Sequence, residues 1–242
     1  MKDMAAILDV LEKTYPEANC SLDFTDPLEL LVATVLSAQC TDERVNQVSK
    51  SLFKKYRSAR DYATASLEDL EGDIRPTGFF RNKAKSLKSC GAALMERFHG
   101  EVPRTLEDLV TLPGIGRKTA NVILGSAFDT PGIVVDTHVG RVAQRIGLTR
   151  HGDPVTIEFD LMALVPQERW TKFSHQLIWH GRRICTARNP KCSRCPLLDH
   201  CDYGEKTLGK SGPGESGDAR KRRSGTGAQS NGKGGGRTRG SR

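Results

Sequence analysis

The sequence predicts an all-α fold, and three observations support this. Apolar residues recur at helical spacing along the chain up to about residue 203. Short turns rich in Gly and Pro separate these segments. The single β-branched run, Ile133–Val135, is too short and isolated to seed a sheet. We therefore expect roughly ten helices joined by short connections.

The first helices follow from an amphipathic and then a fully apolar pattern. Apolar residues at helical spacing predict a helix over residues 7–15. Asp26 and Pro27 predict the next helix start, because proline is tolerated at the first helical position. The run from there to Leu36 is apolar on nearly all sides, which is typical of a buried helix. Further helices are expected at residues 41–53, 66–70, 79–98, about 106–125 (a hairpin of two), 139–146, 154–164 and about 167–184.

The stretch from Leu112 to Asn121 predicts a tight turn inside that hairpin. Gly114 and Gly116 follow Pro113 directly. Glycine accepts a positive φ and leaves no Cβ between the backbone and a ligand. The second helix is expected to begin near Gly116, so its free N–H groups and positive dipole end face the turn. This arrangement suits a phosphate, although a Gly-Ile-Gly turn alone is more often a plain helical hairpin.

Lys118 and Asp136 are the candidate chemical groups around this turn. Lys118 lies in the first helical turn, where the dipole disfavours a cation and makes the neutral, nucleophilic amine more accessible. Asp136 ends the apolar run and precedes renewed helical spacing, so it is expected to be a helix N-cap. The plain alternatives are a solvated surface lysine and an aspartate that only caps.

The basic charge of the chain is concentrated at its C-terminal end. The formal net charge is +8, and ten Lys/Arg against three Asp/Glu give residues 204–242 a charge of +7, which leaves +1 for the body. Any nucleic-acid surface on the body must therefore be a local patch. No aromatic residue follows Tyr203, so we expect residues 204–242 to form a disordered basic tail. It is either a solvated end or a non-specific electrostatic tether to nucleic acid.

Four of the seven cysteines are grouped near the end of the body. They are Cys185, Cys192, Cys195 and Cys201, with gaps of six, two and five residues. A short, loop-rich segment cannot form a core, so four thiolates there indicate a structural zinc or an iron–sulfur centre, with disulfides as the alternative. The wide first gap is less typical of a zinc ribbon. Arg188, Lys191 and Arg194 lie among the cysteines and add positive charge.

The chain shows neither a signal peptide nor a membrane-spanning pattern. Met1 leads straight into an amphipathic segment, and no apolar run approaches the roughly 20 residues needed to cross a bilayer. We therefore expect a cytosolic protein, where cysteines are mostly free, catalytic or metal-bound.

Together these features resemble endonuclease III, the bifunctional DNA glycosylase and abasic-site lyase of the helix-hairpin-helix superfamily. The resemblance rests on the 112–121 hairpin, Lys118, the Val135–Val139 segment and the Cys-x6-Cys-x2-Cys-x5-Cys ending, in one order over about residues 5–203. It implies base-excision repair: removal of damaged bases, expected to be oxidised pyrimidines, from double-stranded DNA. A lysine Schiff base would then cleave the strand 3′ to the abasic site by β-elimination.

The resemblance also implies roles for individual residues. Lys118 would be the Schiff-base nucleophile, and Asp136 would assist departure of the base and the proton transfers. Gln39 would fill the gap left by the flipped nucleotide, and Phe79 or its neighbour Phe80 would be a second wedge. DNA-backbone contacts would come from Leu112, Gly114, Ile115 and Gly116 in the hairpin and from Arg188 and Lys191 near the cysteines. The four cysteines would hold a [4Fe-4S] cluster.

The architecture implied by the resemblance is two helical domains with the active site in the cleft between them. Residues 20–129 would form a central domain with the hairpin at about 106–125, and residues 1–19 would join 130–203 in a cluster domain. The tail, 204–242, has no counterpart in the family. The implied partner is double-stranded DNA containing damaged bases or abasic sites, bound by a monomer in the bacterial cytoplasm at the nucleoid.

Two other functions compete with this interpretation. The mismatch adenine glycosylase shares the cluster and the aspartate but lacks a lysine at the position of Lys118. A non-catalytic DNA-binding or redox-sensing iron–sulfur protein would need only the hairpin and the cysteines, so Lys118 together with Asp136 argues against it.

Overall fold

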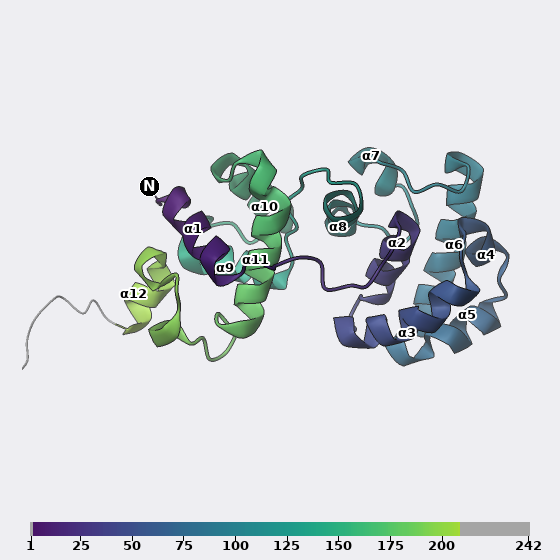
Figure 1. Cartoon of the computed structure of the whole chain (residues 1–242), viewed down its shortest axis with the longest axis horizontal. Coiled ribbons are helices and arrows are strands. Elements are labelled where there is room, and N and C mark those ends of the chain that lie inside the picture. The colour runs from purple at the N-terminus through teal and green to yellow at the C-terminus, as the bar shows by residue number, and fades with distance from the viewer. Residues whose placement is uncertain (1, 209–242) are drawn as a thin grey trace, which may run out of the picture. The chain divides into compact units, whose positions relative to one another are not determined.

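The computed structural model describes residues 2–208, and the expected tail beyond Leu208 lies outside the described residues. Within that range the chain is helical and has no β-strand, which confirms the predicted fold class. The helices, labelled in Figure 1, are α1 (Met4–Thr14), α2 (Pro27–Leu36), α3 (Asp42–Lys55), α4 (Ala59–Thr64), α5 (Leu67–Ile74), α6 (Phe80–Phe98), α7 (Leu106–Leu109), α8 (Arg117–Ala127), α9 (Thr137–Ile146), α10 (Pro154–Leu164), α11 (Trp170–Arg183) and α12 (Asp202–Leu208). Four 3-10 turns accompany them: η1 (Arg75–Thr77), η2 (Gln167–Arg169), η3 (Cys192–Arg194) and η4 (Leu198–His200).

Short polar side chains begin most of these helices. In each case the N-cap side chain accepts a hydrogen bond from an amide of the first turn, which satisfies a group that the helix leaves without a partner. The residues are Asp3, Asp26, Thr41, Ser58, Ser66, Thr105, Asp136 and Asp153. The expected helix start at Asp26 and the expected cap at Asp136 are confirmed.

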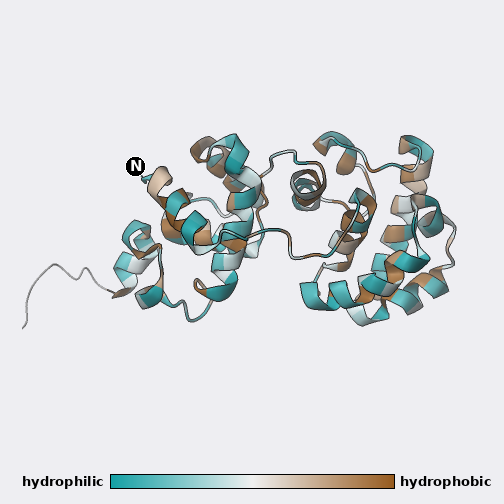
Figure 2. Ribbon diagram, in the orientation of Figure 1, coloured by the Kyte–Doolittle hydropathy of each residue, from teal (hydrophilic) through white to brown (hydrophobic). Residues whose placement is uncertain are grey.

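Two hydrophobic cores organise the described residues. The first is built by α2 to α8 and contains the apolar helix α2, whose residues Leu30–Ala33 are almost fully buried. The second joins α1 to α9, α10, α11 and the cysteine segment around Phe173 and Leu177. Figure 2 shows the hydrophobic faces of each helix group turned toward its own interior. Helix α1 thus packs in the second core, although the first core lies between them in the sequence. The two-domain hypothesis joins the N-terminal residues to the C-terminal part of the chain in the same way.

Four helix expectations need correction. The segment 66–70 is longer and ends at Ile74, and 167–184 is divided into η2 and α11 at Trp170. Helix α4 was not predicted. The tail boundary at 204 was wrong, because α12 continues to Leu208.

Contacts that sequence composition does not report explain the extra helix α12. Lys2 pairs with Asp202, and the Arg145 guanidinium lies 4.5 Å from the centre of the Tyr203 ring. Gly204 is buried against Leu198 and Cys201. Among the helices of residues 2–208, none has the length and apolar character of a membrane span.

Helices α4 and α6 approach each other closely at Gly91 of α6. A Cβ at this position would lie 2.7 Å from the Ala59 oxygen and 2.8 Å from the Ala63 nitrogen of α4. These are backbone atoms, which cannot move aside as a flexible side chain can. The glycine therefore permits α4 and α6 to pack in contact.

We predict that Gly91→Ala lowers the free energy of unfolding by about 1–3 kcal/mol through overpacking. Gly72→Ala is the matched control, because Gly72 is also helical but has no atom within 4 Å of an added Cβ. Alanine there should stabilise the protein by about 0.5–1 kcal/mol through helix propensity. Thermal and urea unfolding followed by circular dichroism measures both, and equal effects at the two positions would contradict the close approach.

Candidate functional site

The predicted hairpin consists of α7, a turn and α8. Gly116 is the N-cap of α8, and Gly114 has φ +83°. A Cβ at Gly114 would also lie 3.1 Å from Cβ of Ser86, so both the turn and its packing require glycine. The expected tight turn with a free helix N-terminus is present.

The hairpin residues divide into two groups. Leu112 and Ile115 are buried at 2% and 5% exposure, and their amides already donate to the carbonyl groups of Leu109 and Leu112. Gly114 and Gly116 are exposed. Of the four residues expected to contact the DNA backbone, only the two glycines have accessible backbone. Leu112 and Ile115 instead anchor the turn in the first core.

Lys118 and Asp136 line one cavity of about 730 Å³, within the range of about 300–1,000 Å³ typical of ligand pockets. Lys118 is the second residue of α8, in the first core, and its side chain is exposed. Asp136 is the N-cap of α9, in the second core. Its Oδ1 accepts from the amides of His138 and Val139, both at 2.8 Å. One carboxylate oxygen thus fixes the side chain, and no hydrogen bond within the described residues uses Oδ2.

Charged and ionisable groups complete the walls of this cavity. Arg182 of α11 donates to Asp42 of α3 at 2.8 Å, and both residues line it. His138 also faces the cavity, and burial lowers its pKa, with Asp136 opposing the shift. Cys40, half-buried, contributes a thiol. The cavity therefore holds a potential nucleophile, a carboxylate and a cation.

A part-buried ion pair joins the helix of Lys118 to the second core. Arg117 of α8 donates from Nε to Oε2 and from Nη2 to Oε1 of Glu158 in α10, both at 2.8 Å. Glu158 is only 6% exposed, and Asn121 also donates to it at 3.1 Å. The Asn121 amide donates in addition to the Ile133 carbonyl at 2.9 Å. This network fixes α8 beside the segment that leads to Asp136.

The two expected DNA-inserting residues both have left-handed backbone conformations. Gln39 has φ 54° and Phe79 has φ 48°, and both side chains are exposed. Phe79 is 64% exposed, the highest value among the large hydrophobic side chains of residues 2–208. Phe80 instead packs against the first core between the guanidinium groups of Arg75 and Arg81. Of the two candidate residues, Phe79 is therefore the one with an exposed side chain.

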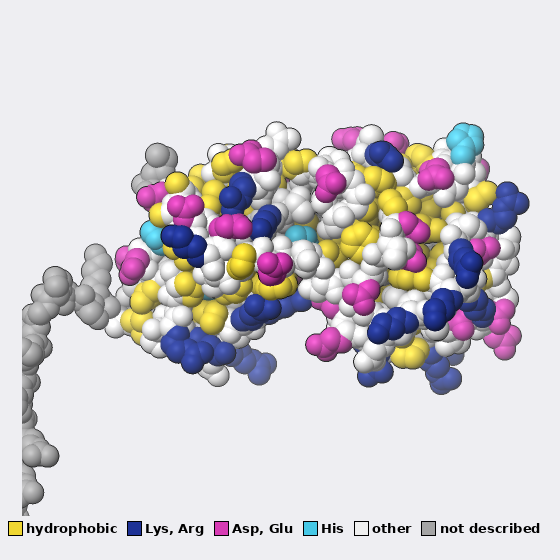
Figure 3. All heavy atoms as spheres, viewed as in Figure 1, with side chains coloured by type: hydrophobic (Ala, Val, Ile, Leu, Met, Phe, Trp, Pro, Cys, Tyr) yellow, Lys and Arg dark blue, Asp and Glu magenta, His cyan; other side chains and the backbone are white. Residues whose placement is uncertain are grey.

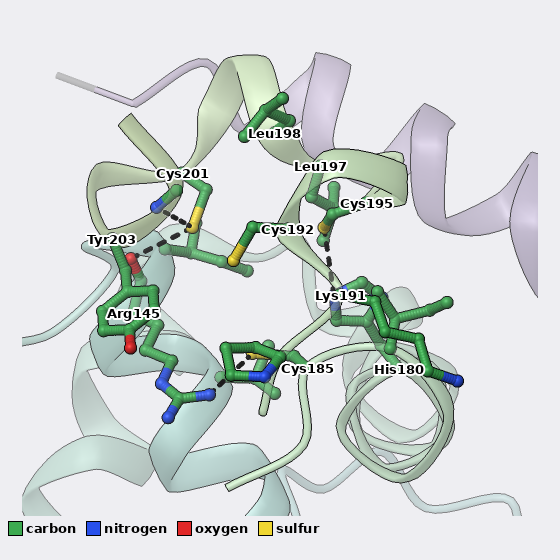
Figure 4. A pocket seen from close by; sticks show the side chains of 15 residues that line it. Arg145, His180, Cys185, Lys191, Cys192, Cys195, Leu197, Leu198, Cys201 and Tyr203 are labelled. Atoms are coloured by element: carbon green, nitrogen blue, oxygen red, sulfur yellow. Dashed lines mark hydrogen bonds between the residues drawn. The ribbon is translucent and has the colours of Figure 1, made fainter. Parts of the chain in front are cut away.

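The four grouped cysteines surround one cavity, as Figure 4 shows. Cys185 accepts from Nη1 of Arg145 at 3.4 Å, and Cys201 accepts from the Gly204 amide at 3.4 Å. The Cys195 sulfur lies 3.6 Å from Nε2 of His180. N–H groups directed at sulfur are the environment in which cluster thiolates are held. The residues present therefore fit an iron–sulfur centre.

The four sulfurs line this cavity together, and a lining of thiolates admits either a structural zinc or an iron–sulfur centre.

The positive residues of this segment lie at its surface. Arg188 and Lys191 are exposed, and Lys191 donates to the Arg183 carbonyl at 3.2 Å. Arg141 and Arg145 of α9 attach the segment to the second core by donating to the carbonyl groups of Cys185 and Thr186 respectively. No motif in the sequence selects these two α9 residues, although a spacing of four residues places both on one helical face.

The sequence also left Glu158 unassigned. Two carboxylates, Glu158 and Asp160, interrupt the largely apolar 154–164 helix, and a buried charge requires a partner. Nothing in the local pattern indicates that Glu158 is the buried one of the two. Its partner Arg117 is adjacent to Lys118 in the sequence.

Comparison with known proteins bears on the whole described region. Residues 32–167 match the HhH-GPD superfamily of base excision DNA repair proteins. Residues 185–201 match the iron–sulfur binding domain of endonuclease III, and this range begins and ends at a grouped cysteine. The second match, together with the sulfur-lined cavity, assigns an iron–sulfur cofactor to this segment.

The alignments with individual relatives cover almost the whole length of each relative. Endonuclease III of Synechocystis sp. is 53% identical over 196 residues, which cover 81% of this chain and 90% of the relative. Endonuclease III of Bacillus subtilis is 47% identical over 207 residues, covering 85% and 94%. A solved structure of a trapped endonuclease III–DNA covalent intermediate superimposes with a TM-score of 0.81 at 47% identity, covering 85% of this chain and 97% of that chain.

We predict that the purified protein is yellow-brown and contains iron and sulfide rather than zinc. Thiolate ligation of iron produces the colour, and residues 185–201 match an iron–sulfur binding domain. Cys192→Ser should lower the iron content and the thermal midpoint together. Cys20→Ser, at a half-buried cysteine outside the segment, should retain both. Colourless protein with one bound zinc would contradict the assignment.

We predict that Glu158→Gln destabilises the protein by about 1–3 kcal/mol, because Arg117 loses its charged partner. DNA cleavage should fall as well, since the altered network borders Lys118. Asp160→Asn is the control on the same helix, because Asp160 bonds to Thr149 and His151 instead of α8. Unfolding midpoints and single-turnover rates are compared, and unchanged cleavage in Glu158→Gln would show that the pair does not position Lys118.

Proposed function

The chain belongs to the endonuclease III family of base-excision DNA repair enzymes, DNA glycosylases with abasic-site lyase activity, and we propose that Lys118 and Asp136 are its catalytic residues. The observation that carries this proposal is their shared cavity. Lys118 reaches it from the first core and Asp136 from the second. A nucleotide extruded into the cavity meets an amine and a carboxylate.

The chemistry of these two groups accounts for both activities. The neutral Lys118 amine attacks the sugar C1′, a C1′–N bond forms, and the glycosidic bond breaks as the base departs with its electron pair. Asp136 assists that departure and the proton transfers through the oxygen that the α9 amides do not use. The C1′–O4′ bond then opens, with a proton passing from the nitrogen to the ring oxygen, and the resulting imine acidifies the C2′ proton. Loss of this proton breaks the C3′–O bond and cuts the strand 3′ to the lesion.

DNA binding in this proposal combines backbone contacts with two inserted side chains. Gly114 and Gly116 offer exposed backbone at a helix N-terminus, which suits a phosphate. Arg188 and Lys191 add exposed positive charge beside the cysteine segment. Gln39 and Phe79 enter the duplex and fill the space of the extruded nucleotide, offsetting part of an unstacking cost of a few kcal/mol. Figure 3 shows basic and acidic side chains interspersed over one face of the molecule. In this proposal, therefore, DNA is attracted by local groups of basic residues and not by a uniformly positive face.

We propose that the [4Fe-4S] cluster is held by Cys185, Cys192, Cys195 and Cys201 and has a mainly structural role. When bound, the cluster cross-links a segment that lacks an extensive core of its own. Arg141 and Arg145 orient that segment against α9, and its ordering presents Arg188 and Lys191 to the DNA backbone.

The substrate, oligomeric state and location complete the proposal. We propose oxidised pyrimidines in double-stranded DNA as the lesions, a monomeric enzyme, and action at the DNA of a bacterial cytoplasm. One chain supplies both catalytic candidates and both wedges, which supports a monomer. A panel of duplexes, each with one defined lesion, tests the substrate class. Preferential release of a mismatched adenine would instead favour the related adenine glycosylase.

We predict that Lys118→Gln abolishes strand cleavage and borohydride trapping on abasic DNA while lesion binding persists. Only an amine forms the imine, whereas the exposed hairpin glycines are unchanged. Lys13→Gln, at an exposed lysine of α1, should retain full activity. Full lyase activity of Lys118→Gln would place the nucleophile elsewhere, and a wild-type protein without any trapping would refute the lyase proposal itself.

Asp136→Asn should also lose base removal, and loss of the negative charge at the N-terminus of α9 lowers stability by about 0.3–1 kcal/mol. Asp3→Asn changes a cap of the same type at α1. Thermal melts and activity assays of both variants separate the two effects. Both variants should lose a similar amount of stability, but only Asp136→Asn should lose activity.

A further inference from the structure

The side chain of Lys83 is buried in the first core, although it is a lysine on a helix with many exposed positions. Its residue is 5% exposed, and burial lowers the pKa of its amine. Nζ donates to the Leu36 carbonyl at 2.8 Å and to the Thr77 carbonyl at 2.9 Å. Neither the hairpin nor the catalytic cavity uses this group.

These two carbonyl groups belong to the segments that carry the wedges. Leu36 is the last residue of α2, and Gln39 follows it after two residues. Thr77 ends η1, and Phe79 follows after one glycine. A single ammonium group therefore ties together two turns that are 41 residues apart, by the numbers of Leu36 and Thr77.

Both turns need an external constraint. Gln39 and Phe79 are non-glycine residues with left-handed φ values, a strained conformation that persists only when its surroundings impose it. Both side chains are exposed and lack a core contact that would hold them. A cation at a helix C-terminus also interacts favourably with the free carbonyl groups there. The donors of Lys83 thus fix the backbone three residues before Gln39 and two residues before Phe79.

We propose that Lys83 is a positioning residue for DNA entry: it holds the Gln39 and Phe79 turns in register, so that both wedges enter the duplex together. This inference rests on the wedge roles in the proposed function. Without the ammonium group the turns relax independently, and extrusion of the damaged nucleotide becomes slow. The chemistry of Lys118 and Asp136 is otherwise unaffected.

Helix α6 provides a matched control residue, Lys88. Its Nζ donates to two carbonyl groups at the end of α4, Ala63 at 2.9 Å and Ala65 at 2.5 Å. Lys88 therefore makes the same kind of bond from the same helix, away from Gln39 and Phe79. Lys83→Met and Lys88→Met each retain the apolar stem and remove the donors.

The experiment compares two reactions of the iron-loaded, full-length protein. The first is single-turnover base removal from a duplex with one lesion, which requires extrusion. The second is borohydride trapping on a single-stranded abasic oligonucleotide, which requires none and also counts active molecules. Lys83→Met should slow the first reaction per active molecule by at least about tenfold, a factor that 1.36 kcal/mol of lost transition-state stabilisation produces. It should leave the second within about twofold.

A fluorescent adenine analogue opposite the lesion reports extrusion directly. Its equilibrium signal should fall in Lys83→Met and stay at the wild-type level in Lys88→Met. Lys83→Gln, which retains an amide donor, is the second variant if the methionine variant does not fold. An unchanged duplex rate, or equal loss on both substrates, would overturn the proposal.

Combination with wedge removal provides the final test. If Lys83 acts through the wedges, adding Lys83→Met to the double variant Gln39→Ala/Phe79→Ala should cause little further loss in the rate of base removal. If the roles are independent, the fold-losses in rate of the separate variants should multiply. Multiplying effects would overturn the inference. Failure of the proposed function looks different, because the unmodified protein would then show no base removal or trapping.

Discussion

The Arg117–Glu158 ion pair is the constraint on which the rest of the site depends. Glu158 is almost fully buried, and a buried carboxylate without a partner would destabilise the fold strongly. The two guanidinium bonds and the Asn121 amide satisfy it, and they connect α8 of the first core with α10 of the second. Since Lys118 follows Arg117 directly, the same contact sets where the proposed nucleophile lies relative to Asp136.

The DNA-facing side of the first core combines strain with rigid support. Gln39 and Phe79 project from turns and have left-handed backbone conformations. Within a helix or a strand, both residues would have regular backbone angles. Exposed apolar and amide groups there are unfavourable in the free protein and become useful only when a duplex receives them. The helix α6 behind them is packed against α4 through Gly91 with no room for a Cβ. The two exposed side chains thus lie next to a helix that is tightly packed against α4.

The cysteine segment follows a different principle. Between Cys185 and Cys201 only Leu197 is fully buried, so packing alone provides little stabilisation. Hydrogen bonds from Arg141 and Arg145 attach its start to α9, and α12 covers its end. A metal centre bound by four sulfurs adds the missing constraint, because its binding free energy becomes folding free energy.

The sequence by itself determined the helical class, most helix starts, the hairpin turn and the cysteine group, because caps, glycines and ligand spacing act within a few residues of each other. It also selected Lys118 and Asp136. Only the tertiary structure decided that Phe79 and not Phe80 is exposed, that α12 extends past residue 204, and that Glu158 and Lys83 have partners far along the chain. Each of these depends on contacts between distant segments, and local patterns carry no information about which buried charge meets which partner.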